Sequence, residues 1–486
     1  MIILSVIIVY FTLLLVLSRF TARRTSNDVF FRGERKSPWY MVAFGMIGAS
    51  ISGVTFVSVP GMVMAQGMTY LQMCLGFVIG YFLVAFVLLP VYYRHNLTTI
   101  YSYLGERLGA RSHLTGTWFF LLSKFVGAAI RFYVVCMLLQ HFVLASFGIP
   151  FYVTVPVMVL LIWLYTRRSG IKTLVWTDTF QTTCMFLSLI LIIIAVISQI
   201  NTPIGNIFNA ILSSNSTLPH TEDNALTRMF VFDDWTSKQN FFKQFFSGIF
   251  ITIVMTGLDQ DMMQKNLTCR TLHDAQKDMC SYGFAFVPAN FLFLLLGVLL
   301  VILANQQGMT LPEKGDDLLP MFAATGQLGT TVMALFTLGI VASSFSSADS
   351  ALTALTTSFC VDVCHRKNDE TFRRSVHIAM AMLFAGAIIA FDAIGSSSVI
   401  DLVYTVCGYT YGPLLGLFAY SIFTRRGVRD TIVPYICIAS PVACYILDQL
   451  MQHVYGYKFG YELLMLNGLL VFTGCWATGN KHTRYY

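Results

Sequence analysis

Charge is what this sequence has least of. Only 11% of its 486 residues are Asp, Glu, Lys or Arg, whereas soluble domains carry about 25%. Hydrophobic residues make up 56% of the chain, and the mean hydropathy is +0.68. This composition excludes an ordinary soluble protein and predicts an all-α polytopic membrane protein.

Motifs of several other protein classes are also missing. The eleven cysteines are scattered through apolar runs without a C-x-x-C pair, which argues against disulfides and metal clusters. The first apolar run, MIILSVIIVYFTLLLVLS, has no basic stretch before it and no small-residue cleavage site after it, so we expect a retained helix rather than a signal peptide. The sequence lacks H-E-x-x-H, G-x-S-x-G and paired aspartates in a G-x-G-D context, and we expect no enzymatic activity.

Thirteen apolar segments approach or exceed the roughly 20 residues that a membrane-spanning helix needs. They lie near 2–18, 39–65, 70–93, 115–145, 151–166, 173–199, 241–262, 276–304, 329–360, 373–392, 397–423, 431–451 and 460–478. With the N-terminus outside, 24 of the 31 Lys and Arg residues fall in cytoplasmic loops, among them Lys265, Arg270 and Lys277, and five fall in the opposite loops. The split follows the positive-inside rule, predicts a cytoplasmic C-terminus and explains the net charge of +7 without nucleic acid as a partner.

Glycine interrupts the second and the seventh segments. The second, MVAFGMIGASISGVTFVSVPG, contains four glycines and a proline, and the seventh, FFSGIFITIVMTGLDQD, contains two glycines. Interrupted helices at matching positions of two halves predict an inverted-repeat transporter whose binding site lies where those helices unwind. Close helix packing is the alternative explanation for any single glycine.

The ninth segment is rich in hydroxyl groups. Its stretch ASSFSSADSALTALTTS, residues 342–358, contains six serines, three threonines and an aspartate. Helical spacing places five of the hydroxyls in one stripe with the aspartate at its edge: Ser343, Ser346, Ser347, Ser350 and Thr357, with Asp349. Such a stripe indicates a monovalent cation site, because a hard cation needs oxygen ligands in place of its water. The alternative is that these hydroxyls bond to the preceding turn or to neighbouring helices.

Two other regions can contribute to the same cation site. Asp178, near the start of the sixth segment, is a second rare carboxylate inside the membrane. The interrupted stretch around Gly48 and Ile51 can supply backbone carbonyls without adding charge.

Four stretches in order resemble the sodium/solute symporter family, which includes sodium/proline, sodium/galactose and sodium/sialic acid transporters. They are GASISGVTFVSVPG, SGIKTLVWTDTFQ, TGLDQDMMQKNLTCRTLHDAQKD and SSADSALTALTTSFCVDV. The resemblance implies one transporter domain over 1–486, with about thirteen helices and a five-plus-five inverted-repeat core that contains two broken helices. Its parts are a leading helix and loop (1–37), a first repeat (38–200), a second repeat (240–424) and two C-terminal helices with a short tail (425–486).

The resemblance also implies sodium ligands. The principal site takes the carbonyls of Gly48, Ile51 and Ser343 and the hydroxyls of Ser346 and Ser347. In members with a second sodium, Asp178 and a serine pair complete it. Here that pair reads Asp349–Ser350, and the aspartate can strengthen the site, bind a proton or pair with neighbouring groups.

Substrate contacts implied by the resemblance come from Ser52, Thr55 and Phe56 beside the first break, and from Gln72. Thr252, Thr256 and Tyr404 are further candidates, with plain packing as the alternative for all seven. Arg131 lies inside the fourth segment, where its guanidinium suits a carboxylate. In sialic acid transporters a substrate-binding arginine lies on this helix about one turn earlier, opposite Ala128, so its role is not transferred directly. Arg131 indicates an anionic solute, or else it pairs with an acid inside the membrane or snorkels to the interface.

We therefore expect a symporter that uses Na+ to import a small polar organic solute by alternating access. The solute is a sugar, an acidic sugar, a carboxylate or an amino acid, and the expected location is the inner membrane of a bacterium. The alternatives are a proton-coupled transporter of the same fold and a cation channel. A transporter-like sensor is a third alternative, which the lack of a signalling domain disfavours. The sequence leaves the number of sodium ions and the oligomeric state open, a monomer included.

Overall fold

The computed structural model describes residues 2–21, 26–140, 144, 148–168, 170–200, 226–235, 237–323, 326–394, 399–457 and 459–479, and the side chains at 2–4, 393–394 and 399–407 lie outside that description. Within these ranges the chain is helical and forms no strand, apart from one isolated bridge between Ser37 and Cys269. The all-α prediction is confirmed for the described residues.

The first half of the chain runs from the leading helix to a long tenth helix. Its elements are α1 (Ile2–Thr21), α2 (Asn27–Arg32), η1 (Gly33–Arg35), α3 (Trp39–Ser50), α4 (Gly53–Gln66), α5 (Tyr70–Leu83), η2 (Val84–Leu88), α6 (Leu89–Arg94), α7 (Ser102–Arg107), α8 (Ala110–Leu139), α9 (Phe151–Thr166) and α10 (Ile171–Gln199).

The second half of the chain also contains one bent helix. Its elements are α12 (Phe241–Thr252), η5 (Ile253–Gly257), α13 (Gln260–Asn266), α14 (Leu272–Gln306), η6 (Gly315–Asp317), α15 (Leu318–Ala323), α16 (Thr330–Ser358), η7 (Phe359–Val363), α17 (Glu370–Ile394), α18 (Val399–Phe423), α19 (Val433–Tyr455) and α20 (Leu463–Thr478).

Many of these helices are long and apolar enough to cross a bilayer. In the described part of the chain, seven qualify as continuous spans, and two further spans result if each of two bent helix pairs counts as one. Shorter apolar helices lie at Ser5–Thr21, Phe151–Thr166 and Leu463–Thr478. The chain is therefore a multi-pass membrane protein, and the total of thirteen helices stays a prediction.

Both interrupted segments are bent, at the places that their glycines indicated. The chain turns by 63° between α3 and α4 and by 69° between α12–η5 and α13. At the first bend Ile51 leaves the helical region, with φ −80° and ψ 83°. At the second bend the Asp259 side chain accepts a hydrogen bond from the Asp261 N–H and so starts a new short helix.

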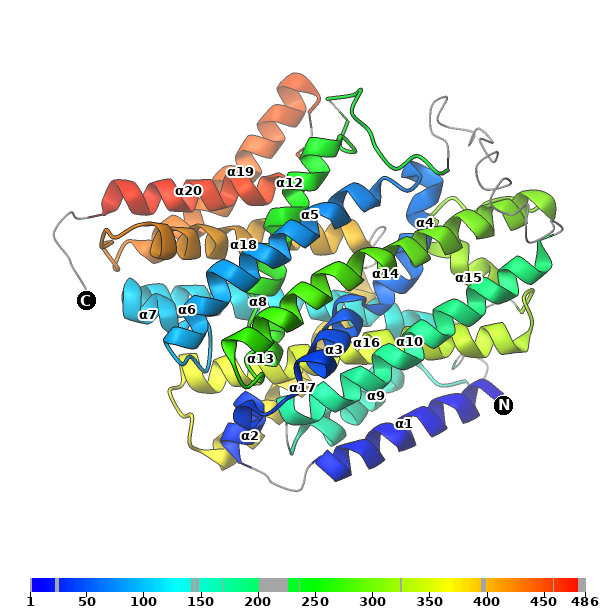
Figure 1. Ribbon diagram of the computed structural model, residues 1–486, viewed down its shortest axis with the longest axis horizontal. Coiled ribbons are helices and arrows are strands. Elements are labelled where there is room, and N and C mark those ends of the chain that lie inside the picture. The colour runs from blue at the N-terminus through cyan, green and yellow to red at the C-terminus, as the bar shows by residue number, and fades with distance from the viewer. Residues whose placement is uncertain are drawn as a thin grey trace.

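The bent helices lie in the middle of the molecule. In Figure 1, α1 lies along the lower edge of the view and α19 at the upper edge, α3 and α13 lie near the middle, and α4 and α12 run from there toward the upper side. Within this core α10 packs against both α16 and α3, while α5 packs against α12 and α14. The hydroxyl-rich helix α16 is thereby held next to the first break.

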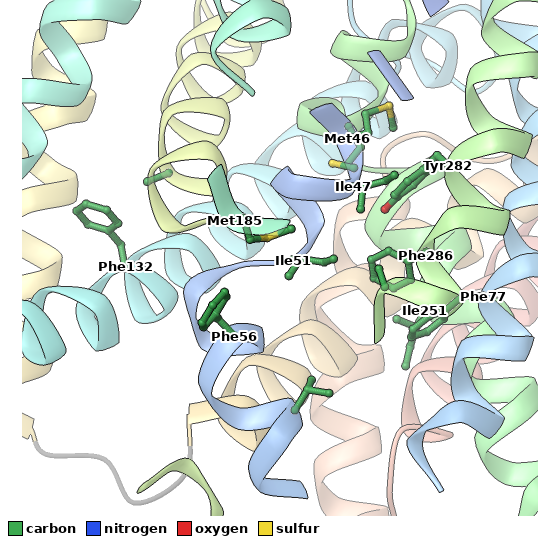
Figure 2. Close-up of a cluster of buried hydrophobic side chains, with 14 of the residues drawn as sticks. Met46, Ile47, Ile51, Phe56, Phe77, Phe132, Met185, Ile251, Tyr282 and Phe286 are labelled. Atoms are coloured by element: carbon green, nitrogen blue, oxygen red, sulfur yellow. The ribbon is translucent and has the colours of Figure 1, made fainter. Parts of the chain in front are cut away.

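The first break is enclosed by apolar side chains from several helices. Figure 2 shows Ile51 in the middle of such a cluster, with Met185 of α10 on one side and Phe286 of α14 on the other. Ile51 and Met185 have no exposed surface. Polar groups that lie at the break are therefore screened from bulk solvent on these sides.

Candidate cation and substrate sites

Two of the three predicted carbonyl ligands, Gly48 and Ile51, lie where α3 ends. The Ser52 N–H bonds to the Ser50 carbonyl at 3.1 Å, so the Gly48 carbonyl loses the N–H partner that a continuing helix would give it. The Ile51 N–H still bonds to the Ile47 carbonyl at 3.0 Å. Carbonyl oxygens released in this way can bind a cation without adding charge.

Helix α16 brings its hydroxyls to this same break. The Ser347 hydroxyl donates to the Ala49 carbonyl at 2.7 Å and lies 3.2 Å from the Ser343 carbonyl. The Ser343 hydroxyl donates back to the Gly339 carbonyl at 2.9 Å. The group of Ser343 that contacts Ser347 is therefore its backbone carbonyl. The structure thus brings the α3 break and α16 together, as the predicted principal site requires.

These groups fit a monovalent cation. A hydroxyl that donates one hydrogen keeps lone pairs for an ion. The Thr182 hydroxyl on α10 is buried without a hydrogen-bond partner, and a Cβ added at Gly48 would lie 1.9 Å from it, so a spare oxygen also faces the break. Among the described residues no three His, Cys, Asp or Glu side chains gather as a metal centre. Mostly neutral oxygens suit Na+ better than a divalent metal.

The residues proposed for a second cation make other contacts. Asp178 forms an ion pair with Lys265, with 2.8 Å between Oδ2 and Nζ, and its Oδ1 accepts from the Ser346 hydroxyl at 2.7 Å. Asp349 accepts from the Tyr165 hydroxyl at 2.7 Å and from the Ser350 hydroxyl at 3.1 Å. Asp349 thus pairs with hydrogen-bonding neighbours here, and its part in a second cation site stays a prediction.

The placement of Lys265 in a cytoplasmic loop is wrong. The seventh segment was expected to end near residue 262, but α13 continues to Asn266, and the Lys265 side chain is only 1% exposed. The partner that makes its burial tolerable, Asp178, lies on α10, far away in the sequence. A rule that counts charges in loops does not detect such a pair.

A cavity with a volume of about 130 Å³ lies beside the first break. Its walls come from α3, α4, α5, α8, α12, η5, α13, α14, α16 and α18. Five of the eight candidate substrate residues line it: Ser52, Thr55, Arg131, Thr252 and Thr256. Residues from both bent helices therefore meet at one cavity.

Of the other three candidates, two make contacts elsewhere and one lies outside the described side chains. Phe56 is fully buried and packs edge-on against Phe293, with ring centroids 5.3 Å apart. The Gln72 amide donates to the Gln239 carbonyl at 2.9 Å and accepts from the Val231 N–H at 2.8 Å, so it fastens α5 to the segment before α12. Tyr404 belongs to α18, and its side chain lies outside the described residues.

The cavity also has a charged wall that the candidate list missed. Lys124 of α8 lies 3.1 Å from Asp259 and 2.6 Å from Asp261, and the Tyr411 hydroxyl donates to Asp259 at 2.6 Å. Two features of the sequence could have indicated this wall: a lysine, Lys124, inside an apolar segment, and two aspartates just after Gly257. Two carboxylates therefore already balance the Lys124 ammonium.

Arg131 differs from Lys124 in its ion-pair partners. It lines the cavity two turns farther along α8, and its side chain is half-buried. Within the part of the chain that the structure describes, no carboxylate lies within ion-pair distance of its guanidinium. Its five N–H donors are thus available to a molecule in the cavity.

Comparison with known proteins gives relatives along most of the chain. The model of the sodium:solute symporter family matches residues 30–430. The sodium/sialic acid symporter SiaT of Proteus mirabilis (strain HI4320) is 23% identical over 445 residues, which are 88% of this chain and 85% of that protein. The sodium/sialic acid symporter NanT of Aliivibrio fischeri (strain ATCC 700601 / ES114) is 23% identical over 425 residues, which are 84% of this chain and 80% of that protein.

A solved structure has the same fold. It is a substrate-bound, outward-open Na+-coupled sialic acid symporter, with a TM-score of 0.83, 22% sequence identity and coverage of 98% of this chain and 97% of the other. These matches identify Na+ as the coupling ion and a small molecule as the second substrate. Because the family model spans more than half of its length, this chain belongs to the sodium:solute symporter family.

Proposed function

We propose that the solute of this sodium-coupled symporter is a small organic anion, an acidic sugar or another carboxylate. The observation that carries the proposal is the cationic Arg131 side chain at the cavity. Lys124 beside it is balanced by Asp259 and Asp261, so Arg131 is the cation whose charge a solute would match. A guanidinium binds a carboxylate through two parallel hydrogen bonds. The two curated relatives described above transport sialic acid, itself an acidic sugar.

Sodium binds, in this proposal, at the first break, to the carbonyls of Gly48, Ile51 and Ser343 and the hydroxyls of Ser346 and Ser347. The adjacency of Ser347 to Ala49 and the spare Thr182 hydroxyl support this assignment. The cavity lies directly beside the break, so bound sodium and bound solute stabilise the same arrangement of α3, α4 and α16. Each ligand then raises the affinity for the other by the same factor.

The proposed topology is that expected from the sequence. Thirteen spans place the N-terminus outside and the C-terminus in the cytoplasm of a bacterium, and 38–200 and 240–424 form two inverted repeats. The two bent helices, one in each proposed repeat, support this division. Alternating access then follows from movement of the two repeats around a cavity that both of them line.

Uptake into proteoliposomes under an inward sodium gradient tests the solute class. We expect uptake of N-acetylneuraminate or a smaller carboxylate, and none of the neutral sugar N-acetylmannosamine. Arg131→Gln should raise KM for the anion at least about tenfold, which corresponds to about 1.4 kcal/mol of binding free energy. Arg131→Lys should restore part of the affinity, because it returns the charge without the planar fork.

The control is Arg374→Gln, which removes an exposed arginine on α17 whose partner, Glu370, is one turn away. This variant should transport as the wild type does. Uptake of a neutral solute with no anion transported, or an unchanged KM in Arg131→Gln, would contradict the proposal.

A further inference from the structure

The Asp178–Lys265 pair is a buried ion pair between α10 and α13, and the proposed symport gives it no role so far. Both side chains are 1% exposed, and 2.8 Å separates Nζ from Oδ2. Charged groups at such depth are expensive and mark functional sites more often than structural ones. The pair also lies at the cation region, because Asp178 accepts from Ser346, one of the proposed principal ligands.

Both carboxylate oxygens of Asp178 already have partners, which disfavours a second sodium ion there. One carboxylate oxygen accepts from the Ser346 hydroxyl, and the other faces the Lys265 ammonium. An ammonium carries the same single positive charge as Na+. A sodium ion on the same carboxylate would lie beside this charge in a region of low dielectric constant, where like charges repel strongly.

Asp349 does not provide another anchor for that ion. Its two oxygens accept from the Tyr165 and Ser350 hydroxyls, and Tyr165 belongs to α9, on another side of α16. Each Asp349 oxygen therefore already accepts one buried hydrogen bond, and a sodium ion would have to share these oxygens with the two donors.

From this geometry we propose that the Lys265 ammonium permanently fills the second cation position beside Asp178, and that the protein binds one sodium ion, at the first break, in each transport cycle. The inference rests on the proposed principal site and adds the stoichiometry to it.

Lys265 then acts as a positioning residue for the sodium that does bind. It lies on α13, its partner Asp178 lies on α10, and the Ser346 hydroxyl that Asp178 accepts from lies on α16. Because the ammonium balances the carboxylate, Asp178 holds the Ser346 hydrogen and leaves the Ser346 lone pairs for sodium. Through Lys265 and Asp178, the short helix α13 of the second bent helix is thus connected to the cation site.

The test counts sodium ions on the purified full chain. Radioactive sodium binding at saturation and the Hill coefficient of sodium-dependent thermal stabilisation should both give about one ion for the wild type. Lys265→Gln frees the Asp178 carboxylate, and both readouts should rise toward two ions. The double variant Lys265→Gln with Asp178→Asn removes both charges and should return to one.

Each outcome is decisive. Two sodium ions in the wild type, or one ion in a folded Lys265→Gln protein, overturns the inference and leaves the proposed symport function intact. No sodium binding by the wild type overturns the sodium assignment itself. If Lys265→Gln fails to fold because its buried carboxylate has lost its partner, the ratio of sodium to solute flux in wild-type proteoliposomes decides: one supports the inference, and two contradicts it.

Discussion

Ser347 is the residue at which the two halves of the proposed sodium site touch. Its hydroxyl bonds to the Ala49 carbonyl on α3 and lies within reach of the Ser343 carbonyl on its own helix. The position of the Ser347 side chain therefore depends on both the bent helix and the hydroxyl-rich helix. Sodium affinity should therefore be more sensitive to Ser347 than to other hydroxyls of α16.

Ser347→Ala removes one proposed oxygen ligand and leaves the Ala49 carbonyl without its donor. We expect the sodium concentration for half-maximal uptake to rise roughly tenfold, about 1.4 kcal/mol, which is near the value of one buried hydrogen bond. The measurement is uptake at a fixed solute concentration over a range of sodium concentrations, with potassium keeping the ionic strength constant.

Thr337→Ala is the matched control for Ser347→Ala. Thr337 is a buried hydroxyl residue on the same helix, but its hydroxyl donates to the Met333 carbonyl one turn back and takes no part in the break. The sodium concentration for half-maximal uptake by Thr337→Ala should stay at the wild-type value. Equal sodium dependence in both variants would remove Ser347 from the site.

At the scale of elements, glycines set how closely the helices approach. A Cβ added at Gly76 of α5 would lie 2.1 Å from the Phe245 carbonyl oxygen of α12, and one at Gly248 would lie 2.4 Å from the Met73 carbonyl oxygen. Since backbone cannot rotate away as a side chain can, α5 and α12 must separate to accept a methyl group. This contact holds the first half of one bent helix in place.

Gly76→Ala should accordingly destabilise the protein by about 1–3 kcal/mol, the usual cost of overpacking. The measurement is the thermal unfolding midpoint of the purified protein. Gly386→Ala on α17 is the control, because no atom lies within 4 Å of its added Cβ, and alanine favours a helix by up to about 1 kcal/mol. If the two variants had the same midpoint, the close approach of α5 and α12 would not be a determinant of stability.

The bent helices could be predicted from the sequence because glycine clusters are local signals. The end of the seventh segment could not, because Lys265 is buried only through its pairing with Asp178 on another helix. Gln72, a substrate contact implied by the family resemblance, bonds through its amide to the backbone of Gln239 and Val231, which lie far away in the sequence. Local patterns identify which residues are unusual, whereas their partners depend on the packing of distant helices.

The cavity shows the same limit. Arg131 was singled out because a lone arginine in an apolar helix is conspicuous, and it does line the cavity. Lys124 is just as conspicuous in sequence, yet two aspartates from the second bend balance it. Only the assembled helices distinguish a cation that is already paired from one that can receive a solute.

At the scale of the whole molecule, the bent helices and the hydroxyl-rich helix pack together beside the cavity, and α1, α19 and α20 lie at the edges (Figure 1). The proposed sodium site and the cavity therefore share one central region. We propose that a change at either site is transmitted through the direct contacts between α3, α16 and α10. In this proposal, coupling of the two substrates is a consequence of the arrangement.

The most direct test of this account is the thermal unfolding midpoint of the purified protein in sodium and in potassium, each with and without N-acetylneuraminate or another small carboxylate. A ligand that binds only the folded state raises the midpoint by mass action. We predict that sodium alone raises it, and that the anion raises it further in sodium but not in potassium. Identical midpoints in sodium and potassium, with and without the anions, would contradict the proposed cation site and its link to the cavity.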